Sequence, residues 1–283
     1  MATDTTAVVA APAEVGVTRP GRSARRRRTL RSKATLRAWQ IVVLAALVGL
    51  WQLVISMHWV DPIIAKSPRQ VFSFLGKSAS SGQLWHNTAA TMEAVVVAFS
   101  LASVVGVAIG ITLGLLPAAE RVVTPFFDAA NAMPRIALAP VFIVWLGIGI
   151  GAKVALAFSI VVFIVVAAAQ GGVRSADPEV LRMSAVFGVS RRHLFYKVLL
   201  PAAIPSIFSG LRLGLVYALL GVVGSEIIAS QNGLGQLITL YSNNYRMDAV
   251  YGILLVLAVI ASILNMIMAT AERWLLRWRP DDV

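Results

Sequence analysis

The sequence predicts an all-α membrane protein in which six helices cross the bilayer. Hydrophobic residues make up 58% of the 283-residue chain, charged residues make up only 13%, and the mean hydropathy is +0.78. A soluble domain is usually about half apolar and a quarter charged, so this composition excludes one. The apolar residues also gather into long runs, and about 20 residues are enough to cross a membrane as a helix. The six runs are approximately 39–57, 91–116, 126–150, 152–173, 204–229 and 249–274.

The first 37 residues are expected to form a disordered, basic tail ahead of a membrane domain that spans residues 38–283. Residues 1–20 are rich in Ala, Thr, Val and Pro and show no period. Nine Lys and Arg residues lie in the tail, four of them consecutive at positions 25–28. A nucleic-acid-binding arm is one interpretation of such a run. An anchor that is attracted to anionic lipid is the other, and we favour it and expect no nucleic-acid partner.

The third run is the weakest, because Pro134 and Arg135 interrupt it. The distribution of basic residues decides whether it crosses, since cytoplasmic loops carry an excess of Lys and Arg. With six crossings and a cytoplasmic N-terminus, 19 Lys and Arg lie inside and 5 lie in the outer loops, with Arg212 within a span. Without the third crossing the split becomes 13 to 11. The sequence therefore favours six spans with both termini in the cytoplasm.

The longest loop between spans, residues 58–90 on the outer side, contains one structured stretch. Ser67-Pro68-Arg69 precedes several closely spaced apolar side chains, which indicates a short helix at the membrane interface. The apolar residues are Val71, Phe72, Phe74 and Leu75.

The most informative segment is the loop of residues 174–204. Asp177-Pro178-Glu179 indicates a helix start, because a carboxylate can cap the helix, proline needs no N–H there, and acid suits the first turn. Gly188 fits the end of this helix, since glycine adopts the left-handed conformation without steric cost. Ser190 can cap a second short helix, which Pro201 is expected to end. This hairpin carries Val186, Phe187, Leu194 and Phe195 among basic residues but has no core of its own, so we expect it to dock into another protein.

The hairpin also resembles a known family. Its pattern Ala185-x2-Gly188-x9-Val198-x-Leu200-Pro201 is similar to the cytoplasmic coupling loop of ABC importer permeases, although the acidic residue that opens the family's pattern is absent. Gly210-Leu211-Arg212-x-Gly214, Glu226 and Gly233-Leu234-Gly235 follow it and resemble the nitrate/sulfonate/taurine branch of these permeases.

The resemblance implies a type I importer permease in a bacterial inner membrane, working with two ATPase subunits that hold ATP and Mg²⁺. It further implies a second permease copy, in a homodimer, and an extracytoplasmic solute-binding protein that delivers a small anionic solute. Basic residues in the outer loops suit such a cargo only weakly, because they are also expected to be solvated. The residues that the resemblance places in coupling to the ATPase are Ala185, Phe187, Gly188, Ser190, Leu194, Phe195, Leu200 and Pro201.

Within the spans, small residues recur along two helix faces. Gly106, Gly110 and Gly114 recur every fourth residue, and Gly210 and Gly214 do so in the fifth span, so backbones can approach closely there. Tight packing and sliding during transport are both open interpretations of these smooth faces.

Polar groups within the spans supply the candidates for the pathway or a gate, because charges in lipid are costly and usually face the bundle interior. Glu226 alternatively reaches the headgroups or caps a neighbouring element, and Arg212 can also reach the headgroups. The pathway candidates are Glu226, Arg212, Tyr217 and Asn131.

The chain lacks the residues of an enzyme. It has no G-x4-G-K-[ST] phosphate loop, no cysteine, and three widely separated histidines. We therefore expect no catalytic residue, cofactor or metal on this chain. A membrane anchor or an intramembrane enzyme subunit of another complex remains the alternative to a transporter.

Overall fold

The computed structural model describes residues 22–57, 61 and 64–275, and the chain forms two units, Met1–Met57 and His58–Val283. The first unit contains one described helix, α1 (Arg22–Ser56), and its apolar stretch Ala38–Ser56 is long enough to cross a membrane.

Residues 22–37, which were expected to belong to the disordered tail, lie in α1, because this helix begins at Arg22. Residues 22–37 contain no Gly or Pro and consist mostly of Arg, Leu, Lys and Ala, which favour helices. The helix of the first span therefore extends back through the basic run. Residues 1–21, also expected to be disordered, lie outside the described residues.

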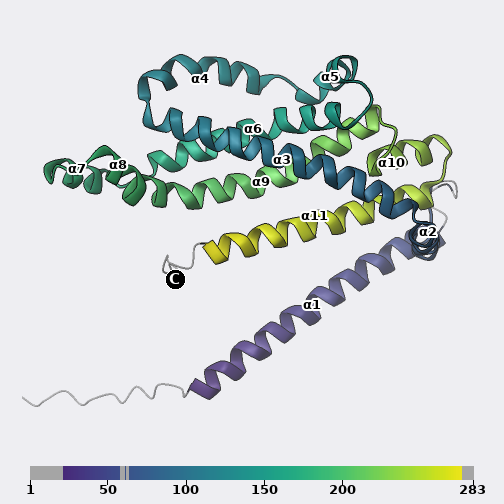
Figure 1. Ribbon diagram of the computed structural model, residues 1–283. Helices are drawn as coiled ribbons and strands as arrows, with labels where there is room; N and C mark the ends of the chain where they lie inside the picture. Colours follow the sequence, from purple (N-terminus) through teal and green to yellow (C-terminus); the bar gives the residue numbers. More distant parts are fainter. Residues whose placement is uncertain (1–21, 58–60, 62–63, 276–283) are drawn as a thin grey trace, which may run out of the picture. The chain divides into compact units, whose positions relative to one another are not determined.

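Three long helices pack side by side and form the core of the second unit (Figure 1). They are α3 (Gln83–Leu115), α6 (Ile150–Arg174) and α9 (Leu200–Ile228), and α6 makes extensive contacts with both of the others. The core between them is built largely from Ala and Val, with Ala98 and Ala218 among its fully buried members. Small side chains allow close approach of helix backbones, as is usual in membrane bundles.

The third expected span is not one straight helix. α4 (Pro117–Ala132) ends before Pro134, and the chain turns through 82° before it enters η1 (Arg135–Leu138) and α5 (Ala139–Leu146). Met133 is extended, with φ −73° and ψ 135°, as the ring of a following proline requires. Counted as one crossing, this bent pair joins five helices that are long and apolar enough to span a membrane, which gives the expected six.

The two ends of the bundle carry different short helices (Figure 1). At one end, α7 (Pro178–Val186) and α8 (Arg191–Leu194) project from the ends of α6 and α9. At the other end, α2 (Pro68–Ser80) and α10 (Leu234–Asn243) pack against α11 (Met247–Leu275).

The expected short helix in the outer loop is confirmed as α2. Ser67 and Gln70 form a reciprocal capping box, in which the Ser67 hydroxyl accepts from the Gln70 N–H and the Gln70 side chain accepts from the Ser67 N–H. Val71 and Phe74 are buried, and Phe72 is exposed.

Candidate functional site

The hairpin at the α7–α8 end is defined by local capping. The Asp177 carboxylate accepts a 2.7 Å hydrogen bond from the Glu179 N–H and caps α7. At the other end of α7, Gly188 has φ +63°, its N–H donates to Ala185, and the next N–H, from Val189, donates to Ser184. This pair of bonds satisfies carbonyls that a helix end leaves open, and it needs a residue that tolerates positive φ.

The second arm of the hairpin does not end at Pro201, so that prediction is wrong. Ser190 caps α8 by accepting from the His193 N–H, and α8 then passes through a π turn, η2 (Phe195–Leu199), into α9. In this turn the Leu200 N–H donates to the Phe195 carbonyl, five residues back. Proline lacks the N–H that a regular α-helix needs. The wider turn just before it changes the bonding pattern and lets the helix continue.

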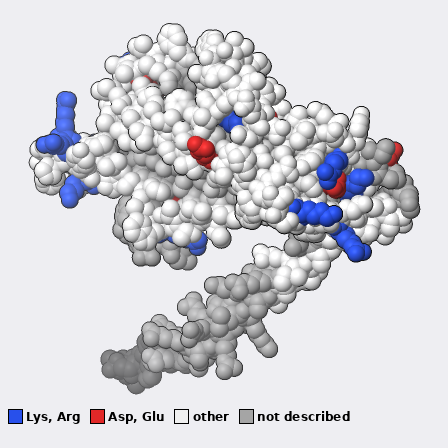
Figure 2. Space-filling view, turned by 45° about the vertical axis from the view of Figure 1, so that its right-hand side comes forward, with Lys and Arg blue, Asp and Glu red and all other residues white. Residues whose placement is uncertain are grey.

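The tip of the hairpin presents apolar side chains to its surroundings. Val186 is 85% exposed and Phe187 is 77% exposed, whereas Leu194 and Phe195 are half-buried, and the Phe195 ring packs against Tyr196. Basic side chains gather at this end of the described body (Figure 2). An exposed apolar tip with basic residues nearby is a surface that a partner protein can bind. The exposed basic residues are Arg182, Arg191, Arg192 and Lys197.

The opposite end of the bundle holds a buried ion pair. The Lys153 ammonium of α6 lies 3.0 Å from the Glu226 carboxylate of α9, and the two side chains are 4% and 0% exposed. The Thr91 hydroxyl of α3 donates to the same carboxylate at 3.0 Å, and the Gly235 N–H donates to it at 2.9 Å. Such a carboxylate is fully hydrogen-bonded, which is what burial of a charge requires.

The same groups fasten the start of α10 to the core. Lys153 also donates to the Asn232 carbonyl at 2.7 Å, and the Thr91 hydroxyl accepts from the Leu234 N–H at 2.9 Å. The Gly233 N–H donates to the Asn87 side chain of α3 at 2.7 Å. Together these bonds link α3, α6, α9 and α10 at one point.

The glycines of the Gly233-Leu234-Gly235 motif make room for this carboxylate. Gly233 has φ +121°, and a Cβ there would lie 2.0 Å from a Glu226 oxygen. A Cβ on Gly235 would lie 2.6 Å from the Val223 carbonyl oxygen. Both distances are far below van der Waals contact, so the motif and Glu226 form one structural unit.

The remaining pathway candidates lie apart from Glu226. Arg212 donates to Asn265 at 2.7 Å and lies 3.7 Å from Glu272, both on α11. Asn131 accepts from Arg135 at 2.8 Å, and Tyr217 is 41% exposed on α9. The structure therefore does not bring the four candidates together. Glu226 is buried, and its carboxylate caps α10.

Sequence reasoning did not single out two charged residues that link helices. Lys153 is one of the five basic residues that the sequence places in the outer loops, but it lies in the first turn of α6 and is buried. Glu120 of α4 accepts from Gln170 at 2.8 Å and forms an ion pair with Arg174, both on α6. The depth of Lys153 and Glu226, each near the same end of its span, was the available signal for their pairing.

The glycine faces lie at the closest helix contacts. A Cβ on Gly110 would lie 2.5 Å from the Val166 carbonyl oxygen of α6, and one on Gly210 would lie 2.1 Å from the Ala168 Cβ. A Cβ on Gly106, Gly114 or Gly214 would also lie 3.0 Å or less from a side-chain atom of α6. A side chain larger than hydrogen at these positions would require the neighbouring atoms of α6 to shift. Within the described residues, no group of three or more His, Cys, Asp or Glu is placed to hold a metal ion.

Comparison with known proteins adds independent information. A family model described as "Binding-protein-dependent transport system inner membrane component" matches residues 102–279. The chain is 29% identical over 246 residues to the taurine transport system permease protein of Escherichia coli (strain K12), covering 85% of this chain and 90% of the relative. It is 32% identical over 237 residues to the riboflavin transport system permease protein of Chloroflexus aurantiacus, covering 84% and 88%. The fold is similar to that of a chain in an inward-facing structure of the MetNI methionine ABC transporter, with a TM-score of 0.58 and 19% identity over 65% of this chain and 91% of that chain.

Proposed function

The chain belongs to the family of binding-protein-dependent transport system inner membrane components, and from this premise we propose that it carries a small anionic solute inward, driven through its α7–α8 hairpin. As a member of this family it is a multi-pass inner-membrane permease subunit of an ABC importer, of the taurine/sulfonate branch. It is not an enzyme, since ATP is hydrolysed on a separate ATPase partner. Family membership sets aside the alternative of an anchor or an intramembrane enzyme.

The observation that carries the coupling role is the exposed apolar tip of the hairpin. The side chains of Val186 and Phe187 are exposed, in contrast to the apolar side chains buried in the bundle. Burial of a large apolar side chain against a partner is favourable by about 1.5–3 kcal/mol. Exposed Phe187 is therefore the better candidate anchor than half-buried Phe195. In this proposal the hairpin and both termini face the cytoplasm, and ATP and Mg²⁺ bind only the partner.

A second copy of the permease completes the pathway in this proposal. The three-helix core of α3, α6 and α9 is closely packed, so a polar solute needs a passage between subunits. Helix α9 carries exposed apolar side chains, Leu213 and Leu220 among them, against which a helix of the second copy can pack. We propose a homodimer with two ATPase subunits and a solute-binding protein on the outer side.

We propose the class of solute from the names of the relatives and from the exposed basic residues at one end of the bundle. The relative of E. coli is named for taurine and that of C. aurantiacus for riboflavin. We favour a small organosulfonate, because the outer end of the described body carries exposed Arg69, Lys77 and Arg246.

The coupling role can be tested by co-purification. The full-length permease is co-expressed with candidate ATPase subunits. Phe187→Asp is compared with the matched change Phe72→Asp, at an exposed side chain of α2 at the other end of the bundle. We expect Phe187→Asp and Gly188→Val to lose the ATPase, while Phe72→Asp and the unmodified chain retain it. Equal retention by all four proteins would refute the coupling role.

The solute class needs a separate assay. Uptake of labelled taurine into vesicles that contain the whole complex and the binding protein is measured with and without ATP. Competition by ethanesulfonate but not by ethylamine is the expected result. ATP-driven uptake that neither compound affects would contradict the anionic class and leave the coupling role standing.

A further inference from the structure

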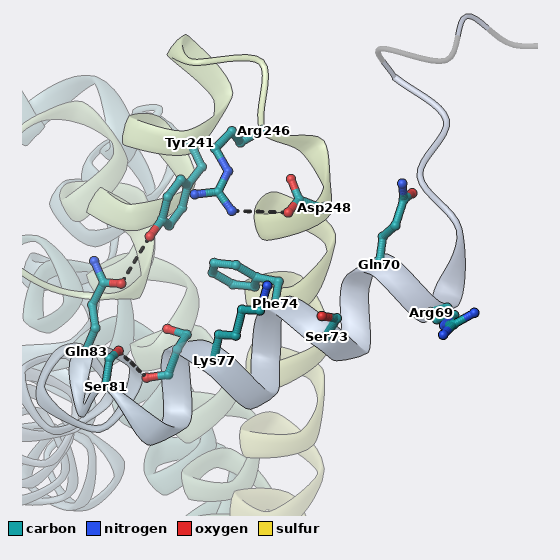
Figure 3. Close-up of a pocket in the computed structure, with 11 residues that line it drawn as sticks. Arg69, Gln70, Ser73, Phe74, Lys77, Ser81, Gln83, Tyr241, Arg246 and Asp248 are labelled. Atoms are coloured by element: carbon teal, nitrogen blue, oxygen red, sulfur yellow. Dashed lines mark hydrogen bonds and ion pairs between the residues drawn. The ribbon is translucent and has the colours of Figure 1, made fainter.

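A pocket of about 550 Å³ opens between α2 and the turn that joins α10 to α11 (Figure 3). It lies at the end of the bundle opposite the hairpin, so it faces outward if the hairpin faces the cytoplasm (Figure 1). Figure 2 shows basic side chains gathered at this end as well. The pocket is large enough for a small solute, since ligand pockets usually measure about 300–1,000 Å³.

Three basic side chains line this pocket and one carboxylate does so, which leaves an excess of positive charge. Arg69 and Lys77 of α2 contribute to the wall, and among the described residues neither forms an ion pair or a hydrogen bond through its side chain. Arg246 comes from the opposite wall and donates to Asp248 at 3.2 Å. Two cationic groups therefore have no counter-charge of their own in the pocket.

The guanidinium of Arg246 is held in place by more than its ion pair. It lies 5.1 Å from the centre of the Tyr241 ring and 5.6 Å from that of Phe74, and the two rings meet edge to face. Cation–π contacts of this kind orient a guanidinium. Because Asp248 takes only part of its hydrogen-bonding capacity, Arg246 keeps N–H groups to donate to a ligand.

A neutral donor completes the lining. Ser78 also lines the pocket, but its hydroxyl oxygen is buried, with less than 1 Å² exposed, so it is not available to a ligand there. The side-chain oxygen of Gln83 accepts from the Tyr241 hydroxyl at 3.1 Å, which leaves the side-chain NH₂ of Gln83 as a donor for a ligand.

We propose that this pocket binds a small oxyanion, a sulfonate or a phosphate, through Lys77 of one wall and Arg246 of the other, with the Gln83 amide as a neutral donor (Figure 3). Arg69 adds positive charge at the edge of the pocket. The oxygens of a tetrahedral oxyanion can accept from donors on both walls. The assignment of the pocket to the transported solute rests on the proposed function. In that role it is the place where the head of an anionic solute first meets the permease. A phospholipid headgroup offers the same chemistry.

The test uses the full-length permease in lipid nanodiscs and trifluoromethanesulfonate as the probe. Broadening of the ¹⁹F signal of this anion reports weak binding. The variant Lys77→Gln/Arg246→Gln is compared with Arg121→Gln/Arg273→Gln, which removes the same charge at exposed positions outside the pocket. We expect the pocket variant to weaken binding at least about tenfold, the control to leave it unchanged, and Lys77→Arg to retain it. Retained ATPase co-purification serves to show that each variant is folded.

The source of the anion is separated by two lipid compositions. In phosphatidylcholine discs, ethanesulfonate and inorganic phosphate should displace the probe. If phosphatidylglycerol discs abolish probe binding both in the unmodified protein and in the Arg121→Gln/Arg273→Gln control, a lipid headgroup is the occupant. The oxyanion site then stands, but its role in transport falls. Equal broadening in both double variants, or none in the unmodified protein, overturns the site itself. These results do not depend on uptake, so failure of sulfonate transport with intact probe binding would refute the proposed solute and not the pocket.

Discussion

The buried pair of Lys153 and Glu226 permits a quantitative prediction. Lys153→Met removes the cation 3.0 Å from a fully buried carboxylate. Removal of one partner from a buried pair usually costs about 3–5 kcal/mol, because the other charge stays desolvated. The Thr91 hydroxyl and the Gly235 N–H still donate to Glu226, so we expect about 3 kcal/mol. That is a large part of a typical folding free energy of about 5–15 kcal/mol.

A double-mutant cycle isolates the pair. Glu226→Gln in the Lys153→Met background removes both charges, so the double variant should be more stable than the sum of the two losses predicts, by about 2 kcal/mol. The measurement is reversible unfolding in mixed micelles that contain increasing SDS, followed by tryptophan fluorescence. The cycle Arg212→Gln/Glu272→Gln is the matched control, since that pair is 43% and 23% exposed and should couple by about 0–1 kcal/mol. Losses that simply add at the buried pair would refute the reasoning.

Two further predictions concern glycine contacts. Gly210→Val should lower stability by about 1–3 kcal/mol, because its Cβ would lie 2.1 Å from the Ala168 Cβ; Ala168→Gly in the same chain should restore part of the loss, and no recovery would contradict the contact. Gly235→Ala places a Cβ 2.6 Å from the Val223 carbonyl oxygen and should lower the apparent melting temperature. Gly224→Ala, which has open space at that position, should not lower it, and equal effects at the two sites would count against the steric explanation.

The hairpin could be predicted from the sequence because its signals are local. Asp177, Gly188 and Ser190 each lie within a few residues of the groups that they cap, and each adopts the expected role. The apolar runs of the long helices are local signals as well. Helix ends and turns of this kind need no information about the rest of the chain.

The ion pair could not be predicted in the same way. Lys153 and Glu226 are separated by 73 positions, and each looks like a residue at the end of a span that reaches water. Only the packing of α6 against α9, which the glycine faces permit, brings them into contact. Sequence position gave their depth but not their direction around the helix.

The two prolines show why local rules fail in one place and hold in another. Pro134 ends α4 because the preceding residue is extended and the chain turns there. Pro201 does not end α8, because the π turn before it supplies another bonding pattern. Both prolines carry the same local signal, and the conformation of the preceding turn separates their outcomes.

Because the helix continues past Pro201, the hairpin is joined to the opposite end of the bundle by one long helical stretch. Residues Arg191–Ile228 form one continuous helical stretch of 38 residues, which is about 57 Å long at 1.5 Å per residue. A tilt of about 5° imposed at its hairpin end, if the stretch stays rigid, displaces the far end by about 5 Å, roughly one helical turn. The far end is where Glu226 accepts from the α10 backbone, so in the proposed coupling role a movement of the hairpin would shift the contact between Glu226 and α10.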